Sequence, residues 1–538
     1  AFVVKDLAGN AERRVTGFPA GARLTNVSWS RDSRHVLATV TLDARLELWV
    51  VDLTRAAARR LTDRPLNGVL DVPTWVDETT IAASFLPASR GAPPAAPTVP
   101  SGPVVQENLS GTRPARTYAD MLANSHDEAL FDHYATAELA LVSLDGKVAP
   151  LGLRGLIANA APSPDGRYLL VATWSRPYSY LVPVSRFPTK IAVHDRTGKL
   201  VHPVANLPLA ENIPIPTGSV RTGPRSVSWR ADVPATLSWV QALDGGDAGR
   251  NAALRDEWFT HAAPFVGAPV SQQKFALRTS GLITWGDDRH AIVTESWRKT
   301  RQVRTWLVAP ETPGAKPTLL FDRSSEDRYG DPGTPVLARN RYGRPTLLLS
   351  ADQKKIYLDG PGASPEGDRP FLDEFDLATK TARRLWRSTA PHYESFVAYL
   401  DDTLTRALTQ REAVTEAPNY YIRRIGEPDD AKALTPITRF TNPYPQFSAV
   451  KKELITYKRA DGVALSGTLY LPPGRQPLDG PLPTLIWAYP REYKDAEAAG
   501  QVKESPYRFI RVSALGPLPF LLAGYAVFDD PTMPIVGA

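Results

Sequence analysis

The sequence has no cysteine among its 538 residues. This absence excludes a disulfide scaffold, a zinc finger, an iron–sulfur site and a cysteine nucleophile within the chain. Long apolar runs are missing as well. The most apolar stretch, residues 513–528, is shorter than the ~18 residues of a membrane span and contains Pro517 and Pro519. We therefore expect no membrane-spanning segment.

Charge of one sign is not concentrated anywhere in the chain. Lysine and arginine number 63 against 57 aspartates and glutamates, which gives a net charge of +6. Blocks of about five or six like charges, which are typical of tails that bind nucleic acid, do not occur. We therefore expect neither nucleic acid nor a membrane as a partner, although local arginine clusters can still favour acidic ligands.

Proline is present in excess. The chain has 50 prolines in 538 residues, about 9% against an average of about 5%. Because proline removes a backbone donor and breaks helix interiors, a mainly helical protein is disfavoured. Hydrophobic residues (43%) and charged residues (22%) lie near the values of ordinary globular proteins, so a mostly disordered chain is excluded.

A degenerate repeat runs through most of the chain. Each copy has an aromatic residue or a proline, a small polar residue and an acidic turn, followed by a β-rich run. The clearest copies lie at residues 28–32, 162–166, 285–288 and 349–352. Aspartate and glycine accept tight-turn geometry, and the flanking β-branched and aromatic residues fit a pleated, half-buried surface. The repeat therefore predicts antiparallel strand pairs joined by acidic turns.

Four such strands make a blade, and blades that recur every 40–55 residues or so predict a radial propeller. The second blade carries an insertion that we interpret as a proline-rich loop at residues 87–103 and a short helix at residues 118–134. An array of two-sheet β-sandwiches is the alternative. We divide the repeat into seven blades, at residues 25–63, 68–152, 155–208, 223–270, 278–323, 334–388 and 390–440.

The pattern changes near residue 450. Residues 452–463 predict a strand ending in an Asp-Gly turn, and residues 465–471 predict its return strand. Two continuous apolar strands follow at residues 483–488 and 524–528, as in a sheet covered on both faces. Strands that alternate with helical segments indicate an α/β sheet. We therefore expect a mainly β fold, with a seven-bladed β-propeller over residues 1–448 and the beginning of an α/β domain over residues 449–538.

The propeller pattern and the K-x-E-x-I-x-Y-x-x-x-D-G-V stretch from Lys451 onward together resemble the prolyl oligopeptidase clan (S9) of serine peptidases. In that clan a propeller caps an α/β-hydrolase domain. Residues 452–474 and 482–492 are similar to the start of that domain, so the resemblance identifies residues 449–538 as its N-terminal part. Three segments look like the glutamyl endopeptidase branch, which is known from chloroplasts and many bacteria: residues 175–183, 489–494 and 524–537.

One departure from the clan concerns the nucleophile. The clan's serine lies in a Gly-x-Ser-x-Gly elbow between a strand and a helix, and the sequence has no such motif. Only Ser466, Ser505 and Ser513 follow residue 450, and no histidine follows His392. We therefore expect the chain to be truncated before the nucleophile elbow, with the Ser/Asp/His triad absent from it. A pseudoenzyme is disfavoured, because the hydrolase sheet would have bare edges.

The resemblance implies that the loop after the first core strand supplies an oxyanion donor. The candidates are Tyr489 and Trp487, the latter at a position where relatives carry tyrosine or histidine. The alternative is that both aromatic side chains only pack. Arg491, which is followed by Glu492 and Lys494, is a candidate for binding an acidic substrate side chain. These three charges could equally form ion pairs on a solvated loop.

A second group of candidate substrate-binding residues lies in the third predicted blade. Arg176, Tyr178 and Arg186 occur with Tyr180 in a proline-rich, loop-like run. Arginine binds a carboxylate through its planar fork, which suits a peptidase that reads glutamate. The alternative is that these arginines stack on aromatic side chains at a blade edge. A further candidate set is Arg298, Arg301 and Arg304. Side chains alternate along a strand, so these three would not all face the same way, which weakens a joint role in substrate binding.

The resemblance implies a serine peptidase of the prolyl oligopeptidase type that prefers glutamate at P1 and whose propeller gates access. An acylaminoacyl-peptidase or dipeptidyl-peptidase of the same clan is the alternative enzyme, and a non-catalytic propeller that binds proteins is the alternative of another class. We expect peptide substrates, no cofactor and no metal, because the eight histidines are scattered. A homo-oligomer is left open.

The sequence gives few indications of the cellular compartment of the protein. No signal peptide is visible, and the chain begins at Ala1, so we expect an N-terminal segment to have been removed or to lie outside the sequence. The resemblance to exported bacterial enzymes favours a periplasmic or secreted protein over a cytoplasmic one.

Overall fold

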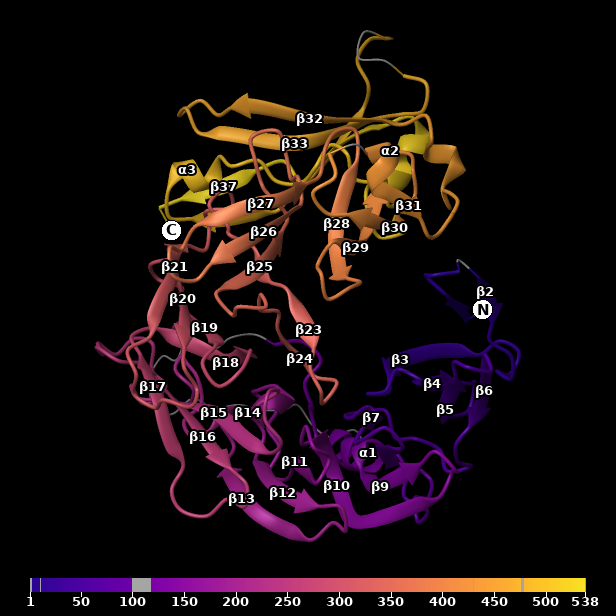
Figure 1. Ribbon diagram of the computed structural model, residues 1–538, viewed down its shortest axis with the longest axis vertical. Helices are drawn as coiled ribbons and strands as arrows, with labels where there is room; N and C mark the ends of the chain where they lie inside the picture. Colours follow the sequence, from indigo (N-terminus) through magenta and orange to yellow (C-terminus); the bar gives the residue numbers. More distant parts are fainter. Residues whose placement is uncertain (1, 10, 99–117, 429, 476–478, 538) are drawn as a thin grey trace. The chain divides into compact units, whose positions relative to one another are not determined.

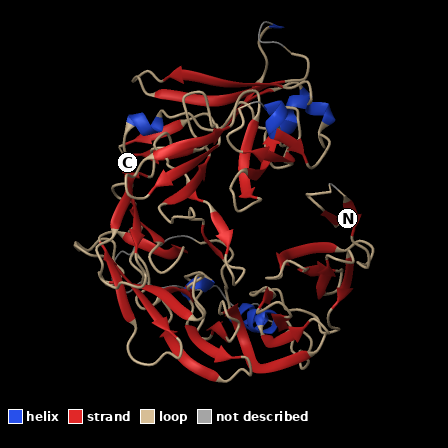
Figure 2. Cartoon of the chain, viewed as in Figure 1, coloured by secondary structure: helices blue, strands red, loops and turns tan. Residues whose placement is uncertain are grey.

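The computed structural model describes residues 2–9, 11–98, 118–428, 430–475 and 479–537 (Figure 1). Strands prevail, and the few helices are short, so the expected mainly β class is confirmed (Figure 2). The predicted domain boundary at 448/449 stays a prediction. The chain forms two compact units: the first comprises Ala1–Glu295, Trp306–Thr318 and Arg339–Thr346, and the second comprises Ser296–Thr305, Leu319–Ala338 and Leu347–Ala538.

The first four-stranded sheet shows how the repeated motif folds. In the turn between its first two strands, the Ser30 hydroxyl donates to Asp32 at 2.6 Å and accepts from the backbone N–H of His35 at 2.9 Å. The motifs at residues 162–166 and 349–352 make the same two bonds. In these three copies the motif is therefore a serine–aspartate turn that joins antiparallel strands. The copy at residues 285–288 has no serine, and there Asp287 accepts from the backbone N–H groups of Arg289 and His290 at 2.9 Å. The strands of this sheet are β3 (Arg23–Trp29), β4 (His35–Thr41), β5 (Leu46–Asp52) and β6 (Ala57–Arg60).

A seven-stranded antiparallel sheet follows, built around one long strand. The first part of β10 (Val148–Pro162) pairs with β9, and the second part pairs with β11, with register shifts in both pairings. The sheet is thus two four-stranded meanders that share β10. Its other strands are β7 (Thr74–Trp75), β8 (Thr80–Phe85), β9 (Ala137–Ser143), β11 (Tyr168–Trp174), β12 (Thr189–Asp195) and β13 (Leu200–Leu207).

Four more four-stranded sheets follow along the chain. The strand groups coincide, to within a few residues, with the segments that we predicted as blades. The strands of the first two are β14 (Arg225–Trp229), β15 (Thr236–Ala242), β16 (Asp256–Ala262) and β17 (Val270–Phe275), and β18 (Arg278–Trp285), β19 (Ala291–Trp297), β20 (Gln302–Val308) and β21 (Thr318–Ser324). Those of the last two are β22 (Thr334–Pro335), β25 (Lys355–Gly360), β26 (Phe371–Asp376) and β27 (Ala382–Arg387), and β28 (Tyr393–Tyr399), β29 (Arg406–Glu412), β30 (Asn419–Arg424) and β31 (Leu434–Pro436).

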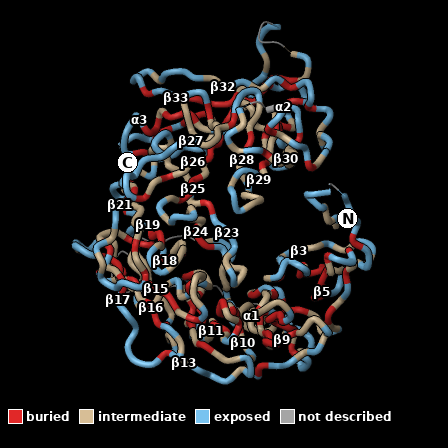
Figure 3. Tube along the Cα trace, in the orientation of Figure 1, coloured by how far each residue is buried: buried red, intermediate tan, exposed pale blue. Residues whose placement is uncertain are grey.

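Successive sheets of the first unit pack face to face. Leu48 of the first sheet and Ile81 of the next lie in one buried cluster. Leu170 of β11 and Trp239 of β15 lie in another. Figure 3 shows buried residues concentrated along the strands. Each fully buried leucine or isoleucine side chain contributes about 1.5–3 kcal/mol, so these interfaces supply much of the stability of the unit.

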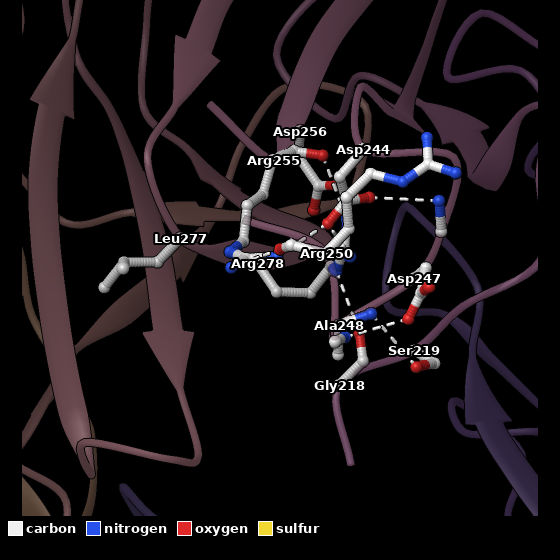
Figure 4. A network of polar contacts seen from close by, with 12 residues as sticks. Gly218, Ser219, Asp244, Asp247, Ala248, Arg250, Arg255, Asp256, Leu277 and Arg278 are labelled. Carbon is white, nitrogen blue, oxygen red and sulfur yellow. Dashed lines mark hydrogen bonds and ion pairs between the residues drawn. The ribbon is translucent and has the colours of Figure 1, made fainter. Parts of the chain in front are cut away.

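A buried charge network lies in the β14–β17 sheet (Figure 4). Asp244 lies 2.9 Å from Arg255 and 2.7 Å from Arg278. Asp256, the first residue of β16, lies 2.6 Å from Arg278 and 2.8 Å from Arg225. Both carboxylates are fully buried, and the hydrogen bonds from Arg278 hold the pKa of Asp244 below its usual value in spite of burial. Since Arg278 begins β18, the network ties two consecutive sheets together.

The C-terminal region of the second unit is a mixed sheet in the order β32–β33–β36–β34. The first three strands pair antiparallel, and β36 pairs parallel with β34, so the predicted strands at residues 452–528 are confirmed. Leu521 and Val527 belong to its buried core. The elements are β32 (Lys451–Lys458), β33 (Ala464–Leu471), β34 (Thr484–Trp487), β35 (Pro490–Tyr493), α3 (Ala496–Ala499), η4 (Leu518–Ala523), β36 (Ala526–Asp529) and β37 (Met533–Val536).

The remaining elements are short. The inserted helix α1 spans Ser125–Ala135, so its predicted start at residue 118 is wrong. Asn124 sets the start, because its side chain accepts from the backbone N–H of Asp127. Residues 99–103 of the predicted loop lie outside the described residues. The other elements are β1 (Val3–Lys5), β2 (Glu12–Arg14), η1 (Val184–Arg186), β23 (Leu337–Arg339), β24 (Pro345–Leu347), α2 (Asp430–Ala433) and η2 (Pro445–Phe447).

None of the helices in the described part of the chain combines the length and the apolar character that crossing a membrane requires.

Candidate functional site

Two parallel strands end side by side in the second unit. β34 pairs with β36 so that Trp487 lies opposite Asp529, the last residue of each strand. Beyond this point the backbone N–H of Asp530 donates to the Trp487 carbonyl at 2.9 Å, and the two chain segments pair again as β35 and β37. Ligand sites in α/β sheets lie beyond the carboxyl ends of the strands. This strand end is therefore the candidate site.

Both predicted oxyanion residues are exposed at this strand end. The Trp487 side chain is on the last residue of β34 and is 52% exposed, and Tyr489 is 75% exposed. Within the described residues, neither ring packs on another aromatic ring and the Tyr489 hydroxyl has no hydrogen-bond partner. A donor for a reacting oxygen must present a free N–H or O–H, and these side chains are free to do so. Their role as oxyanion donors stays a prediction.

The third candidate at this edge already has a carboxylate neighbour. Arg491 of β35 lies 3.5 Å from Asp530, and both side chains are substantially exposed. Glu492 lies 3.9 Å from Arg301, and the backbone N–H of Lys494 donates to Glu326 at 2.9 Å. Exposed ion pairs are weak, typically below about 1 kcal/mol, so a substrate carboxylate can compete for Arg491.

Burial at the end of β36 disfavours ionisation of one carboxyl group. Burial raises the pKa of Asp529, the neighbouring Asp530 raises it further, and Lys452 opposes the rise. Burial also lowers the pKa of Lys452 to about 8. The Lys452 ammonium donates to the carbonyls of Ser505 at 2.9 Å and Arg508 at 3.2 Å. The pKa values of the Asp529 carboxyl group and of the Lys452 amine are thus both shifted toward the neutral forms.

The second predicted set lies beside α1 in the first unit. Arg176 donates to Asp132 through Nε at 3.1 Å and through Nη2 at 2.7 Å, and it also pairs with Glu128. The Tyr178 hydroxyl donates to Asp132, and the Tyr178 ring lies under the Arg176 guanidinium at 4.8 Å. Burial, followed by Asp132, raises the pKa of Tyr178.

These contacts bear on how Arg176 could bind a substrate. Its guanidinium already has two carboxylate partners, so an incoming carboxylate must displace one of them. Arg186 lies over the ring of Tyr118 at 5.9 Å. This geometry is the stacked arrangement that the sequence left open as the alternative. Substrate binding by Arg176, Tyr178 and Arg186 stays a prediction.

The three arginines in and near β20 lie in different environments. Arg301 is buried and donates to Glu326 at 2.5 Å, whereas Arg304 donates to Asp322 at 3.0 Å. Arg298 is exposed. Different partners and different exposures confirm that these arginines have separate environments.

Several polar partners were missed from the sequence. Glu128 and Asp132 are four residues apart on α1, a spacing that places two carboxylates on one helix face and could have identified them as partners of an arginine. Asp530 follows the end of β36 and has a positive φ of 43°. No pattern in the sequence identified it as a partner of Arg491.

Serine chemistry is not assembled in the described residues. Ser466 and Ser505 are both buried, and the Ser466 hydroxyl lies 3.5 Å from the Thr532 hydroxyl. Nowhere in the described ranges do three or more histidine, aspartate or glutamate side chains gather so that they could hold a metal ion. The groups that this chain offers at the candidate site are hydrogen-bond donors and charges.

Two curated proteins are similar to this chain over nearly its whole length. No family model matches the chain. It is 43% identical over 553 residues to the Oryza sativa subsp. japonica protein named "Probable glutamyl endopeptidase, chloroplastic". It is 41% identical over 553 residues to the Arabidopsis thaliana protein of the same name. These alignments cover 98% of the chain but only 58% and 57% of the two relatives. The chain therefore spans less than two thirds of the length of these relatives.

A solved structure agrees with this placement at the level of the fold. A prolyl endopeptidase structure matches with a TM-score of 0.50 and 13% identity, over 95% of this chain and 61% of that one. The two curated relatives, together with this likeness in fold, support the resemblance to the prolyl oligopeptidase (S9) family of serine peptidases.

Proposed function

We propose that the protein carrying this chain is a serine endopeptidase that hydrolyses peptides with a preference for glutamate at P1. The observation that carries the proposal is the 43% identity, over 98% of the chain, to a protein named as a glutamyl endopeptidase. Acylaminoacyl- and dipeptidyl-peptidase activities are the alternatives within the same clan. A non-catalytic, protein-binding propeller is the alternative of another class.

We also propose that residues 1–448 form a seven-bladed propeller and that residues 449–538 begin the hydrolase domain. Among the described residues, seven groups of four neighbouring strands support the propeller, because each has the strand order of a blade. Face-to-face packing of consecutive sheets in the first unit supports it further. A propeller would limit access to peptides small or unfolded enough to enter.

The mixed sheet supports the hydrolase assignment. Its end strand β34 has exposed residues at Thr484, Ile486 and Trp487. An exposed apolar end strand is unfavourable unless another strand or a layer covers it. Further strands of a hydrolase sheet, which would carry the nucleophile elbow, would provide that cover.

Within this chain, the strand end would serve the tetrahedral intermediate of acyl transfer. The Tyr489 hydroxyl, or a backbone N–H near Trp487, would donate to the developing oxyanion. Arg491 would attract the acidic side chain of the substrate, because its competing pair with Asp530 is exposed and loose. The 538 residues contain no Gly-x-Ser-x-Gly elbow, so we assign no serine or histidine of this chain to the acylation step.

Localisation and partners are part of the proposal. A periplasmic or secreted location follows from the resemblance to exported enzymes, whereas the two curated relatives carry the word chloroplastic in their names. Peptides are the expected partners, and a homo-oligomer is left open.

The test uses the longest form of the protein that cells make. We expect a fluorophosphonate probe to label it and to block cleavage of a peptide with glutamate at P1, while matched peptides with proline or alanine at P1 are cleaved much more slowly. Absence of labelling would refute the serine peptidase. Equal cleavage of all three peptides would refute the glutamate preference alone.

A further inference from the structure

A pocket in the first unit gathers arginines and aromatic rings from three separate segments. It has a volume of about 300 Å³. The end of β3 supplies Trp29 and the turn after it supplies Arg31. The other lining residues are Trp75 from β7 and Arg339, Tyr342 and Arg344 from the hairpin at residues 339–346. All of these residues belong to the first unit. A pocket of this size accommodates one or two side chains of a ligand.

Positive charge is in excess around this pocket. Among its lining residues, Asp77 is the carboxylate, and it is paired with Arg196 at 2.6 Å. Glu78 lies next to it and pairs with Arg31 at 3.4 Å. Within the described residues, neither Arg339 nor Arg344 has a carboxylate partner. Two guanidinium charges are therefore left for a ligand.

The arginines are held in place, which limits the entropy that a ligand must overcome. Arg344 donates through Nη2 to the Pro162 carbonyl at 2.8 Å, and Arg31 donates to the Pro164 carbonyl at 2.5 Å. Burial, together with the nearby Arg31, lowers the pKa of Arg344. An anion in the pocket would offset both effects.

The hairpin that carries Arg344 is fixed closely against Arg31. Asn340 donates through its side chain to the Ala231 carbonyl at 2.7 Å and accepts from the Arg344 backbone N–H at 3.1 Å. Gly343 has a φ of 69°, and a Cβ there would lie 3.0 Å from the Arg31 Cγ. Glycine favours this close approach, because any other residue would crowd Arg31 and strain the backbone.

We propose that this pocket binds a carboxylate of a peptide, with Arg344 and Arg339 on the carboxylate and Trp29, Trp75 and Tyr342 against the adjoining apolar atoms. A guanidinium matches a carboxylate through two parallel N–H···O bonds, and aromatic walls suit a peptide. The choice of a peptide as the ligand rests on the proposed function. The carboxylate comes either from a glutamate or aspartate side chain or from a C-terminus.

The experiment measures binding to the 538-residue chain by fluorescence anisotropy, apart from any cleavage. One labelled peptide has a single glutamate and capped termini, a second has glutamine in its place, and a third has glutamine and a free C-terminus. We expect Arg344→Gln and Arg339→Gln each to weaken the binding of the glutamate peptide, or of the peptide with a free C-terminus, about tenfold or more. The capped glutamine peptide is expected to bind weakly to every variant.

Arg55→Gln is the matched control, because it removes the same charge from an arginine whose side chain is 81% exposed outside the pocket. It should leave all three affinities unchanged. Arg344→Lys keeps the charge but loses the fork, and it should recover only part of the affinity. If Arg344→Gln does not fold, Arg339→Gln and Arg344→Lys carry the test.

Three results would overturn the proposal. The first is equal binding of the carboxylate peptides and the capped glutamine peptide. The second is wild-type affinity in the Arg339→Gln variant and in the Arg344→Lys variant. The third is that the arginine substitutions weaken the binding of a single-stranded oligonucleotide but leave peptide binding unchanged. The binding assay does not depend on cleavage. A failure of the proposed peptidase function would therefore appear only in the cleavage assay described above and could be told apart from a failure of this proposal.

Discussion

The buried network around Asp256 gives the sharpest prediction about the first unit. Replacing Asp256 with asparagine keeps the shape of the side chain and an oxygen that can accept from the Thr279 backbone N–H, now at 2.8 Å. It removes the charge that lies 2.6 Å from Arg278 and 2.8 Å from Arg225. The carboxylate is fully buried, and the side chains of the two arginines are only 8% and 12% exposed.

The magnitude follows from what is left behind. Removing one member of a buried ion pair costs about 3–5 kcal/mol, because the remaining charge is buried without compensation. Asp244 still neutralises part of the Arg278 charge, so we expect the lower end, about 3 kcal/mol. If this free energy appears in the local opening of β16, its amide hydrogens exchange roughly 150-fold faster, since each 1.4 kcal/mol or so is tenfold.

Hydrogen exchange followed by mass spectrometry is the suitable assay, because it reports on β16 separately from the second unit. Asp63→Asn is the control, since Asp63 is 89% exposed in its pair with Arg60. That change should alter the free energy of local opening by less than about 1 kcal/mol. If Asp256→Asn accelerated exchange in β16 no more than Asp63→Asn does, the buried network would not stabilise these sheets.

Three further predictions concern single side chains. Burial lowers the pKa of Lys452 to about 8. Its charged form therefore destabilises the fold at pH 7 by up to about 3 kcal/mol. The free energy of unfolding should rise as the pH increases from about 8 to about 10.5. Lys452→Met should raise the unfolding temperature at pH 7 and abolish that rise, whereas exposed Lys458→Met should do neither. Burial raises the pKa of Asp71 to about 6, so Asp71→Asn should stabilise the protein at pH 7.5 by up to about 3 kcal/mol, with a gain that disappears as the pH falls from about 6 to about 4. An unchanged melting curve at pH 7.5 would contradict that result. Tyr489→Phe in the cell-made protein should lower kcat about 100-fold or more with little change in KM; a change in KM alone would indicate substrate binding instead of oxyanion stabilisation.

Local patterns in the sequence were sufficient for much of the fold. The serine–aspartate turns at Ser30 and Ser163 use bonds between residues two to five apart, so their pattern is visible in the sequence. The strand pair on either side of Gly462 was predictable for the same reason, because an Asp-Gly turn fixes it. By contrast, the start of α1 depended on recognising Asn124 as a cap.

Contacts between distant residues could not be predicted in this way. The carboxylates on Arg176 come from α1, more than 40 residues earlier in the chain. The pocket at Arg344 needs the hairpin to meet residues 29–31, about 300 positions away, and no spacing rule connects them. Long-range pairing is set by how the sheets pack, which a single sequence does not display.

The most direct measurement of the central claim is the sequence of the cleavage products. The cell-made protein is incubated with a peptide library prepared from a denatured proteome, and the new C-termini are identified by mass spectrometry. We predict that most of them are glutamate and that they disappear after treatment with fluorophosphonate. New C-termini without a glutamate preference, or cleavage that persists after the probe, would contradict a glutamyl-specific serine peptidase.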